Sequence, residues 1–211
     1  MADLCVGFAE MVISGDVDVI ATAVQEALNA GTEAHTILDE ALCGMSVVGQ
    51  RFKVGDMFIP EVLRSAAAMN AALDVLQPLL SGPESSRLAT VVIGTVEGDI
   101  HSIGKDLVAT LLQGAGFRVV NLGVDVKSAA FVQAIQEHKP SLVAMSALLT
   151  TTTEKMGETL RAIREAGVRD QVKVIVGGAP VTKEFAVEIG ADGYAPNAGG
   201  AVEEARVLVG D

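Results

Sequence analysis

The stretch GTVEGDIHSIGKD, residues 94–106, is the part of this sequence from which the fold and the site can be worked out. It follows an apolar run, Leu88 to Ile93, and precedes an apolar-periodic segment, Leu107 to Gln113. That order predicts a strand, a polar loop and a helix. Within the loop, Asp99 and His101 are two residues apart. The carboxylate can therefore accept the N–H of one ring nitrogen, while the other nitrogen points outward as a ligand or base.

A polar loop between a strand and a helix also has an ordinary interpretation. Asp99 or Ser102 can serve only as the N-cap of the helix, and a single histidine can be an incidental surface residue. A phosphate-binding P-loop does not fit, because Gly98 and Gly104 are one residue too far apart and Lys105 is not followed by Ser or Thr. The loop alone therefore leaves both a metal ligand and a surface histidine open.

Two short elements further along the chain favour the metal ligand. Ser146-Ala147-Leu148 and then Gly177-Gly178 follow the D-x-H-x-x-G stretch in that order. The set D-x-H-x-x-G, S-x-L and G-G resembles the cobalamin-binding motif of methionine synthase and of the corrinoid proteins of methylamine, methanol and betaine methyltransferase systems. The resemblance implies a bound cobalamin whose benzimidazole tail is detached from cobalt and replaced by a histidine, the base-off, His-on state.

The same resemblance implies a role for each residue of the motif. His101 is expected to bind cobalt, Asp99 to hold its other nitrogen, and Ser146 to extend the hydrogen-bond chain to the carboxylate. No catalytic residue is expected. The threonines 150–153 offer hydroxyls to the nucleotide tail, or form only an N-cap and a β-branched first turn of a helix. The residues expected to contact the cofactor are Gly98, Asp99, His101, Ser102, Ile103, Gly104, Ser146, Leu148, Thr150, Gly177, Gly178 and Tyr194.

Composition restricts the class of protein. The 211 residues are 50% hydrophobic and 3% aromatic, with no Trp, which is typical of a helix-rich α/β protein. No run approaches the roughly 20 apolar residues of a membrane span, and no secretory signal is evident, so a cytoplasmic location is expected. The net charge of -12 argues against nucleic acid or an anionic membrane as partner. Cys5 and Cys43 form no C-x-x-C pair and are expected to be buried.

The first part of the chain, residues 1–84, has helical periodicity. Breaks at Gly15-Asp16, Gly31 and Gly55 to Pro60 divide it into four helices with short connections, which predicts an antiparallel bundle. This part holds twelve Asp and Glu against three Lys and Arg. Such a charge favours a solvated surface, with a docking face for a basic partner as the alternative.

One segment of the bundle, residues 44–73, resembles the corresponding segment of the small methyltransferase corrinoid proteins. In that family the bundle lies over the upper face of the corrin ring and shields the methyl group. The resemblance implies that some of this segment's apolar residues form the cover, with ordinary core packing as the alternative for each. The residues considered for the cover are Met57, Phe58, Val62 and Met69.

The second part, residues 85–211, follows the Gly-, Pro- and Ser-containing segment Ser81 to Ser86, where the domain boundary is expected. Five apolar runs alternate with amphipathic segments, which predicts a Rossmann-like (flavodoxin-like), doubly wound, parallel five-stranded sheet. Such sheets bind ligands at the carboxyl ends of their strands, where all three motif elements fall. The expected strands are Leu88–Ile93, Arg118–Leu122, Leu142–Met145, Val172–Val176 and Gly193–Ala195, and the expected helices are about 102–115, 127–138, 152–167, 181–189 and 199–209.

The resemblance covers nearly the whole chain and implies a non-catalytic methyl carrier, which would fall in the transferase class if classified. It implies a substrate-specific methyltransferase, a second, methyl-accepting methyltransferase and a reductive activase as partners. One alternative is a cobalamin-dependent regulator or photosensor, which needs a DNA-binding head and a tryptophan that this sequence lacks. Others are the small subunit of an adenosylcobalamin mutase, which commonly has no bundle, and a generic flavodoxin-like binding domain.

Overall fold

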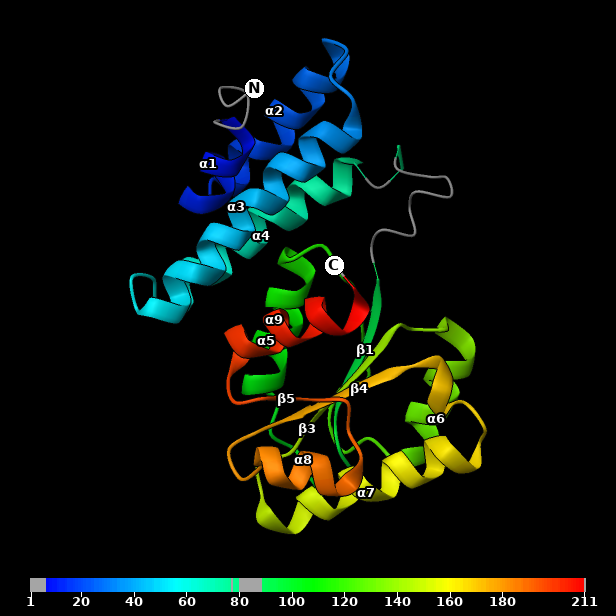
Figure 1. Cartoon of the computed structure of the whole chain (residues 1–211). Helices are drawn as coiled ribbons and strands as arrows, with labels where there is room; N and C mark the ends of the chain where they lie inside the picture. The colour runs from blue at the N-terminus through cyan, green and yellow to red at the C-terminus, as the bar shows by residue number, and fades with distance from the viewer. Residues whose placement is uncertain (1–6, 77, 80–88, 211) are drawn as a thin grey trace. The chain divides into compact units, whose positions relative to one another are not determined.

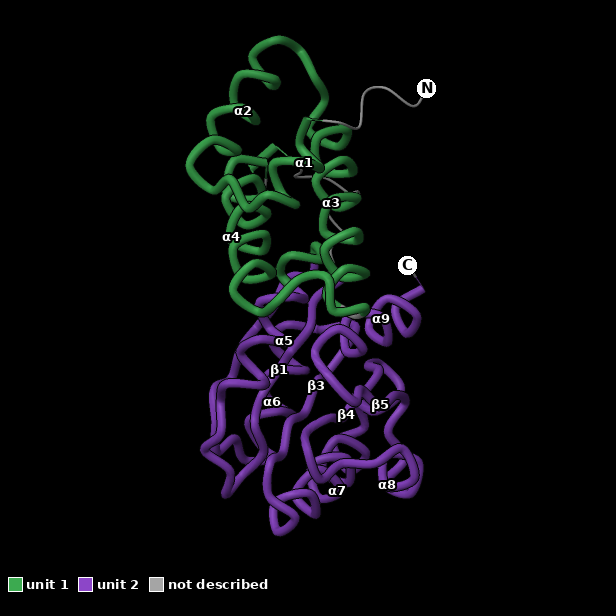
Figure 2. The backbone as a smooth tube through the Cα atoms, turned by 90° about the vertical axis from the view of Figure 1, so that its left-hand side faces the viewer, with its two compact units in different colours: residues 1–88, 113–116 green, residues 89–112, 117–211 purple. Residues whose placement is uncertain are grey.

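The chain forms two compact units. The structure is a computed structural model that describes residues 7–76, 78–79 and 89–210 (Figure 1). Unit 1 comprises residues 1–88 and 113–116, and unit 2 comprises residues 89–112 and 117–211 (Figure 2). The boundary expected at Ser81 to Ser86 lies outside the described residues.

Unit 1 is the expected helical bundle. Its core is made of residues spaced by helical turns, among them Val12, Ile20 and Met69, which are fully buried. The third helix ends at Gly55, whose φ of +83° closes the helix in the left-handed conformation that glycine adopts without strain. The described helices of the bundle are α1 (Gly7–Ser14), α2 (Val17–Asn29), α3 (Ala34–Val54) and α4 (Ile59–Leu76).

The residues considered for a cover differ in exposure. Val62 and Met69 are fully buried among the helices of unit 1, and Met57 is 7% exposed, so these three are packing residues. Phe58 is 70% exposed. Cys43 is also exposed, contrary to expectation, because Gly44 is the residue of this turn that faces α1: a Cβ there would lie 2.7 Å from the carbonyl oxygen of Ala9.

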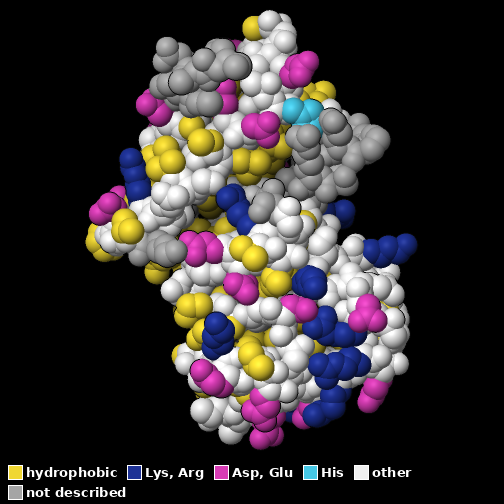
Figure 3. Space-filling view, in the orientation of Figure 1, with side chains coloured by type: hydrophobic (Ala, Val, Ile, Leu, Met, Phe, Trp, Pro, Cys, Tyr) yellow, Lys and Arg dark blue, Asp and Glu magenta, His cyan; other side chains and the backbone are white. Residues whose placement is uncertain are grey.

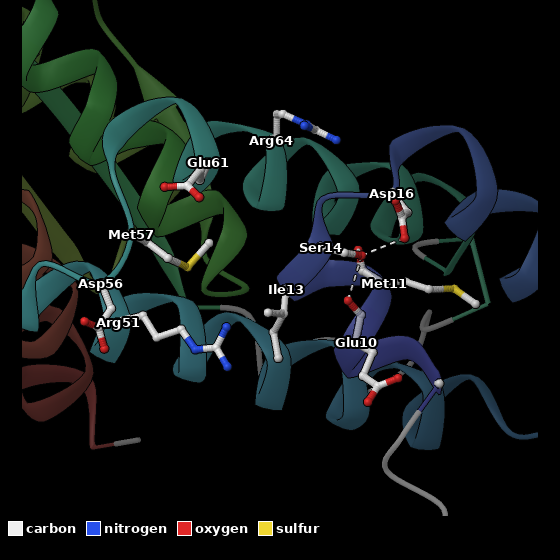
Figure 4. A pocket seen from close by; sticks show the side chains of 11 residues that line it. Glu10, Met11, Ile13, Ser14, Asp16, Arg51, Asp56, Met57, Glu61 and Arg64 are labelled. Atoms are coloured by element: carbon white, nitrogen blue, oxygen red, sulfur yellow. Dashed lines mark hydrogen bonds between the residues drawn. The ribbon is translucent and has the colours of Figure 1, made fainter.

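A groove of about 880 Å³ lies in unit 1 (Figure 4). Arg51 on α3 and Arg64 on α4 line it together with apolar side chains such as Met57. Its carboxylates are those of Glu10, Asp16, Asp56 and Glu61. Four carboxylates and two guanidinium groups therefore line the groove.

Unit 2 is the expected parallel sheet covered by helices on both faces. The strand order is β2-β1-β3-β4-β5, and every pairing is parallel. Helices α5 and α9 lie on one face, and α6, α7 and α8 lie on the other (Figure 1). The strands are β1 (Thr90–Thr95), β2 (Arg118–Asn121), β3 (Leu142–Ser146), β4 (Lys173–Gly177) and β5 (Gly193–Ala195); the helices are α5 (Ile103–Gly114), α6 (Ser128–His138), α7 (Thr150–Glu165), α8 (Lys183–Ile189) and α9 (Ala198–Val209), with a short 3-10 helix at Arg169–Gln171.

The register of the sheet brings the motif loops to one edge. Ser146 is paired with Thr95 on one side and with Gly177 on the other. The last residues of β1, β3 and β4 are therefore level with one another. The loops that follow these strands carry the three motif elements, and they emerge next to one another, as expected for the ligand-binding edge of a doubly wound sheet.

The surface of unit 2 carries most of the basic side chains. Figure 3 shows Lys and Arg gathered on this unit, whereas acidic side chains are spread over both units. None of the described helices combines the length and the apolar composition that crossing a membrane requires.

Candidate functional site

The centre of the site is Asp99, whose side chain is fully buried and accepts five hydrogen bonds. Oδ1 accepts the main-chain N–H of His101 at 3.0 Å and lies 2.7 Å from Nδ1 of the same residue. Oδ2 accepts the N–H groups of Leu148 at 2.7 Å and Leu149 at 3.3 Å, and the hydroxyl of Thr152 at 2.9 Å. Both oxygens are thus surrounded by donors.

These donors keep Asp99 ionised although it is buried. Burial by itself raises the pKa of a carboxyl group, but the hydrogen bonds from Leu148, His101 and Thr152 outweigh it and hold the pKa of Asp99 well below its usual range. The donors from Leu148 and Leu149 come from the residues just before α7, where the helix dipole also favours a negative charge.

His101 is held at one ring nitrogen and open at the other. Because Asp99 is acceptor-only when ionised, Nδ1 of His101 carries the proton of their 2.7 Å contact. Among the described residues, no hydrogen-bond partner is recorded for Nε2, and the side chain is 47% exposed. Thr95 fixes the main chain by donating its hydroxyl to the carbonyl of His101 at 2.9 Å. The arrangement presents a nitrogen lone pair at a fixed position.

The third member of the hydrogen-bond chain is Thr152 and not Ser146. Ser146 ends β3, and its main-chain carbonyl accepts the N–H of Val96, while its side chain lines a cavity. Thr152 lies in the first turn of α7, and this turn brings its hydroxyl to Asp99. The expectation for Ser146 was wrong because the chain turns sharply between strand and helix. A hydroxyl six residues further on, and not the strand end, reaches the buried carboxylate.

A cavity of about 620 Å³ lies beside this chain, at the carboxyl edge of the sheet on the α5 and α9 face. Its wall is largely apolar, with Ile93, Ala144 and Ile175 contributed by successive strands. Polar side chains of the lining include Asn197. The residues of the sequence motif that line the cavity are His101, Ser102, Ile103, Gly104, Ser146, Leu148, Gly177 and Gly178.

The other expected contacts lie elsewhere. Gly98 is in the loop before the histidine with a φ of +80°. Thr150 is the exposed first residue of α7. Tyr194 pairs with Val176 and packs against the hydrophobic cluster under α7 and α8, so the structure does not bring its side chain into the cavity. Its neighbour Ala195 has the opposite orientation and lines the cavity.

The motif glycines serve different purposes. A Cβ on Gly178, whose φ is +129°, would lie 1.8 Å from the carbonyl oxygen of Ala147. A Cβ on Gly177 would lie 2.8 Å from the carbonyl oxygen of Ala195. These two glycines are therefore required by the packing of the protein itself. A Cβ on Gly104 would meet no atom within 4 Å, so the packing of the protein does not itself require this glycine.

Sequence reasoning missed a buried lysine next to the motif. The side chain of Lys105 is 1% exposed, and its Nζ donates to Asp106 and, at 2.8 Å, to Asn121. The hydrogen bond from Lys105 lowers the pKa of Asp106. This cluster joins the start of α5 to the end of β2. It could not be read from sequence because Asn121 approaches only through the pairing of β1 with β2.

Comparisons with known proteins agree with this geometry. B12-binding domain families match residues 89–203 and residues 4–77. The chain is 45% identical over 197 residues to trimethylamine corrinoid protein 1 of Methanosarcina acetivorans, covering 92% of this chain and 91% of that protein. It is 42% identical over 202 residues to dimethylamine corrinoid protein 1 of Methanosarcina mazei, covering 95% and 94%.

Two solved structures resemble the whole chain. One is the methanol:cobalamin methyltransferase complex MtaBC from Methanosarcina barkeri, with a TM-score of 0.86 and 30% identity, covering 99% of this chain and 80% of that chain. The other is a cobalamin-binding protein from Desulfitobacterium hafniense, with a TM-score of 0.80 and 32% identity, covering 99% of both chains.

The bundle, the parallel sheet and the hydrogen bond of buried Asp99 to His101 define a cobalamin-binding protein of two units. More particularly, the chain belongs to the family of corrinoid proteins of methyltransferase systems. The fold class and the cofactor expected from the sequence are thereby confirmed.

Proposed function

We propose that this chain carries a methyl group on a bound cobalamin, from a substrate-specific methyltransferase to a second, methyl-accepting methyltransferase. The observation that carries the proposal is the buried Asp99, which fixes His101 beside a cavity of about 620 Å³ that this histidine helps to line. The names of the relatives, trimethylamine and dimethylamine corrinoid proteins, favour a methylated amine as the methyl source.

The residues present fit a base-off, His-on cobalamin. Among the described residues, no group of three or more His, Cys, Asp or Glu could hold a metal ion. A single imidazole fits a metal whose other positions are filled by a macrocycle. The apolar cavity fits a detached nucleotide tail, and the open space beside Gly104 fits the approach of a large planar group.

In this proposal Asp99 and its hydrogen-bond donors keep a lone pair on Nε2 of His101. A bound cobalamin supplies the cobalt that carries the methyl group. Asp99 keeps the proton of His101 on Nδ1, which leaves the lone pair on Nε2 for the metal. Thr152 and the N–H groups before α7 hold the carboxylate in place.

The division of labour between the two parts of the chain belongs to the same proposal. Residues 1–84 would be the domain that covers the upper face of the corrin ring, and residues 85–211 would be the domain that binds the cofactor. The separate matches of residues 4–77 and 89–203 to B12-binding domains support this division. The match of residues 4–77 also disfavours the mutase subunit, which commonly lacks such a bundle.

The partners follow from the methyl-carrier role. The likeness to the MtaBC complex supports a methyltransferase partner. The second methyltransferase, the reductive activase and the cytoplasmic location expected from the sequence complete the proposal. Its most direct partner test is methyl transfer. After chemical reduction of the cobalt to Co(I), the cobalamin-loaded chain should be methylated by a trimethylamine or dimethylamine methyltransferase, and failure with every methylamine enzyme would contradict the amine assignment.

Reconstitution with hydroxocobalamin tests the site itself. After reduction to Co(II), the EPR spectrum of the wild-type protein should show hyperfine coupling to an imidazole nitrogen. His101→Ala should lose this coupling yet still bind cobalamin, because the cavity proposed to take the nucleotide tail remains. Coupling to a benzimidazole nitrogen in the wild type would contradict His101 as ligand, and absence of stoichiometric binding would contradict the cofactor.

A further inference from the structure

A second aspartate, Asp125, lies between β2 and α6 and is hydrogen-bonded to the loop that carries Asp99. Its Oδ1 accepts the main-chain N–H of Gly98 at 2.7 Å, and its own N–H donates to the main-chain carbonyl of Asp99 at 2.9 Å. An isolated parallel β-bridge between Val96 and Val126 joins the same two loops. The peptide group that precedes Gly98 and the peptide group that follows Asp99 are thus both hydrogen-bonded to one residue.

Asp125 holds this position in an unusual backbone conformation. Its φ is +53°, and in the described part of the chain only Lys139, at +45°, is another non-glycine residue with a positive φ. Such a conformation is disfavoured for a side chain with a Cβ and persists where surrounding contacts impose it. Asp and Asn tolerate it best among the residues with side chains. The two hydrogen bonds that Asp125 makes therefore hold it in a conformation that is otherwise disfavoured.

Asp99 is consequently fixed from two directions. Its carboxylate is held by donors at the start of α7, and its main chain is held by Asp125. Because Nδ1 of His101 lies 2.7 Å from that carboxylate, the position of the ring follows the position of Asp99. Asp125 itself is not among the residues that line the cavity.

We propose that Asp125 is a positioning residue: it sets the place of the Asp99–His101 pair, and through it how firmly His101 binds the metal, without touching the cofactor. This inference rests on the proposed function, since it concerns His101 as a ligand. The loss of one hydrogen bond of this kind from an ordered loop should weaken ligation about 3- to 10-fold.

Three substitutions separate the hydrogen bond from the backbone conformation. Asp125→Asn keeps an acceptor oxygen and tolerates the positive φ, so it should ligate like the wild type. Asp125→Gly accepts the positive φ without strain but removes the acceptor, and should lower the ratio of His-on to His-off cobalamin about 3- to 10-fold. Asp125→Ala removes the acceptor and adds strain, and should lower that ratio at least as much.

The measurements use the full chain with and without cofactor. EPR of the Co(II) form gives the ratio of imidazole-bound to unbound cobalamin, and cobalamin affinity should stay within about twofold of wild type. Nitrogen-15 NMR of the cofactor-free protein reports the ring of His101 directly. Lys139→Gly and Lys139→Ala are matched controls, because they change the other strained residue, which caps α6, and should alter stability only.

The outcomes are distinct. Wild-type ligation and an unchanged His101 ring signal in Asp125→Gly would overturn the inference, and so would an Asp125→Asn protein that behaves like Asp125→Gly. If the wild type binds cobalamin without imidazole on cobalt, the proposed function fails. In that case the NMR signal of the cofactor-free variants still decides whether Asp125 positions His101: a shift in Asp125→Gly that is absent in Asp125→Asn supports it, and no shift overturns it.

Discussion

Replacing Asp99 by asparagine changes the atoms that determine the state of His101. A carboxylate accepts hydrogen bonds at both oxygens, whereas an amide accepts at its oxygen and donates at its NH2 group. In the native site, His101 donates to Oδ1, while Leu148, Leu149 and Thr152 donate to Oδ2. The NH2 group of an asparagine must therefore face one of these two sets of donors.

The two orientations of the asparagine differ in free energy. With NH2 toward α7, the N–H groups of Leu148 and Leu149 lose their acceptor, at about 1–3 kcal/mol each. Thr152 keeps a partner, because its hydroxyl also donates to the carbonyl of Leu149 at 2.9 Å. With NH2 toward His101, only the main-chain N–H of His101 is left unpaired, since Nδ1 can become an acceptor. The second orientation is favoured by about 1–3 kcal/mol, the cost of one buried donor.

The favoured orientation moves the ring proton of His101. Nδ1 then accepts from the amide, so the proton resides on Nε2, which has no lone pair left for a metal. Asparagine in place of the aspartate of a serine protease triad acts through the same wrong tautomer. We therefore expect Asp99→Asn to lower the free energy of unfolding by only about 1–3 kcal/mol. Imidazole ligation should weaken about 5- to 150-fold, which is the same free-energy difference expressed as a ratio.

Three measurements on Asp99→Asn check this reasoning. Urea unfolding gives the stability, nitrogen-15 NMR of the cofactor-free protein gives the tautomer of His101, and EPR of the Co(II) form gives the ligand. Asp170→Asn, at an exposed aspartate of the short 3-10 helix, is the control and should change none of them. A variant that keeps the proton on Nδ1 and retains the imidazole coupling would refute the argument.

Three further predictions concern the surroundings of Asp99. Thr152→Ala should destabilise the protein by about 1–2 kcal/mol in urea unfolding, because a donor to a buried carboxylate is lost, and Thr152→Ser should restore most of it. Gly178→Ala should cost at least about 3 kcal/mol or prevent folding, since its Cβ would overlap the carbonyl of Ala147; Gly167→Ala, where φ is +72° and the Cβ meets no atom, should cost about 1–2 kcal/mol. The pKa of Asp99 is lower in the folded state than the unfolded value of about 3.9, so its contribution to stability is complete above about pH 5 and is lost progressively as pH falls below it. Acid titrations of the unfolding free energy should show this loss in the wild type and a smaller one in Asp99→Asn.

The sheet could be predicted from the sequence because its signals are local. Apolar runs and helix-ending glycines recur along residues 89–210, and the strands lie within a few residues of their expected places. The face of the sheet on which Tyr194 lies could also have been predicted, because side chains alternate between the two faces along a strand. Gly193 and Ala195 face the cavity side of β5, so Tyr194 between them faces the hydrophobic cluster.

The contacts that complete the site depend on approach between distant segments. Asp125 reaches Gly98 only because β1 and β2 pair in one register, and that register brings Val96 opposite Val126. The position of Thr152 could have been predicted from the sequence, since a helix that begins just after β3 places the hydroxyl of its first turn near the carboxyl end of that strand. In the bundle, the spacing of Val62 and Met69 by two turns already favoured a shared core face.

The site joins a rigid carboxylate to a half-exposed imidazole, and this combination follows from what each group has to do. A carboxylate buried without donors would become protonated and could then donate to Nδ1, which would move the ring proton to Nε2. The five hydrogen bonds to Asp99 hold its pKa well below its usual range, so near neutral pH it only accepts. The proton therefore stays on Nδ1, and Nε2 of His101, a residue that lines the cavity, keeps its lone pair. The hydrogen bonds to Asp99, which outweigh the effect of its burial, are therefore what keeps Nε2 of His101 available to a metal.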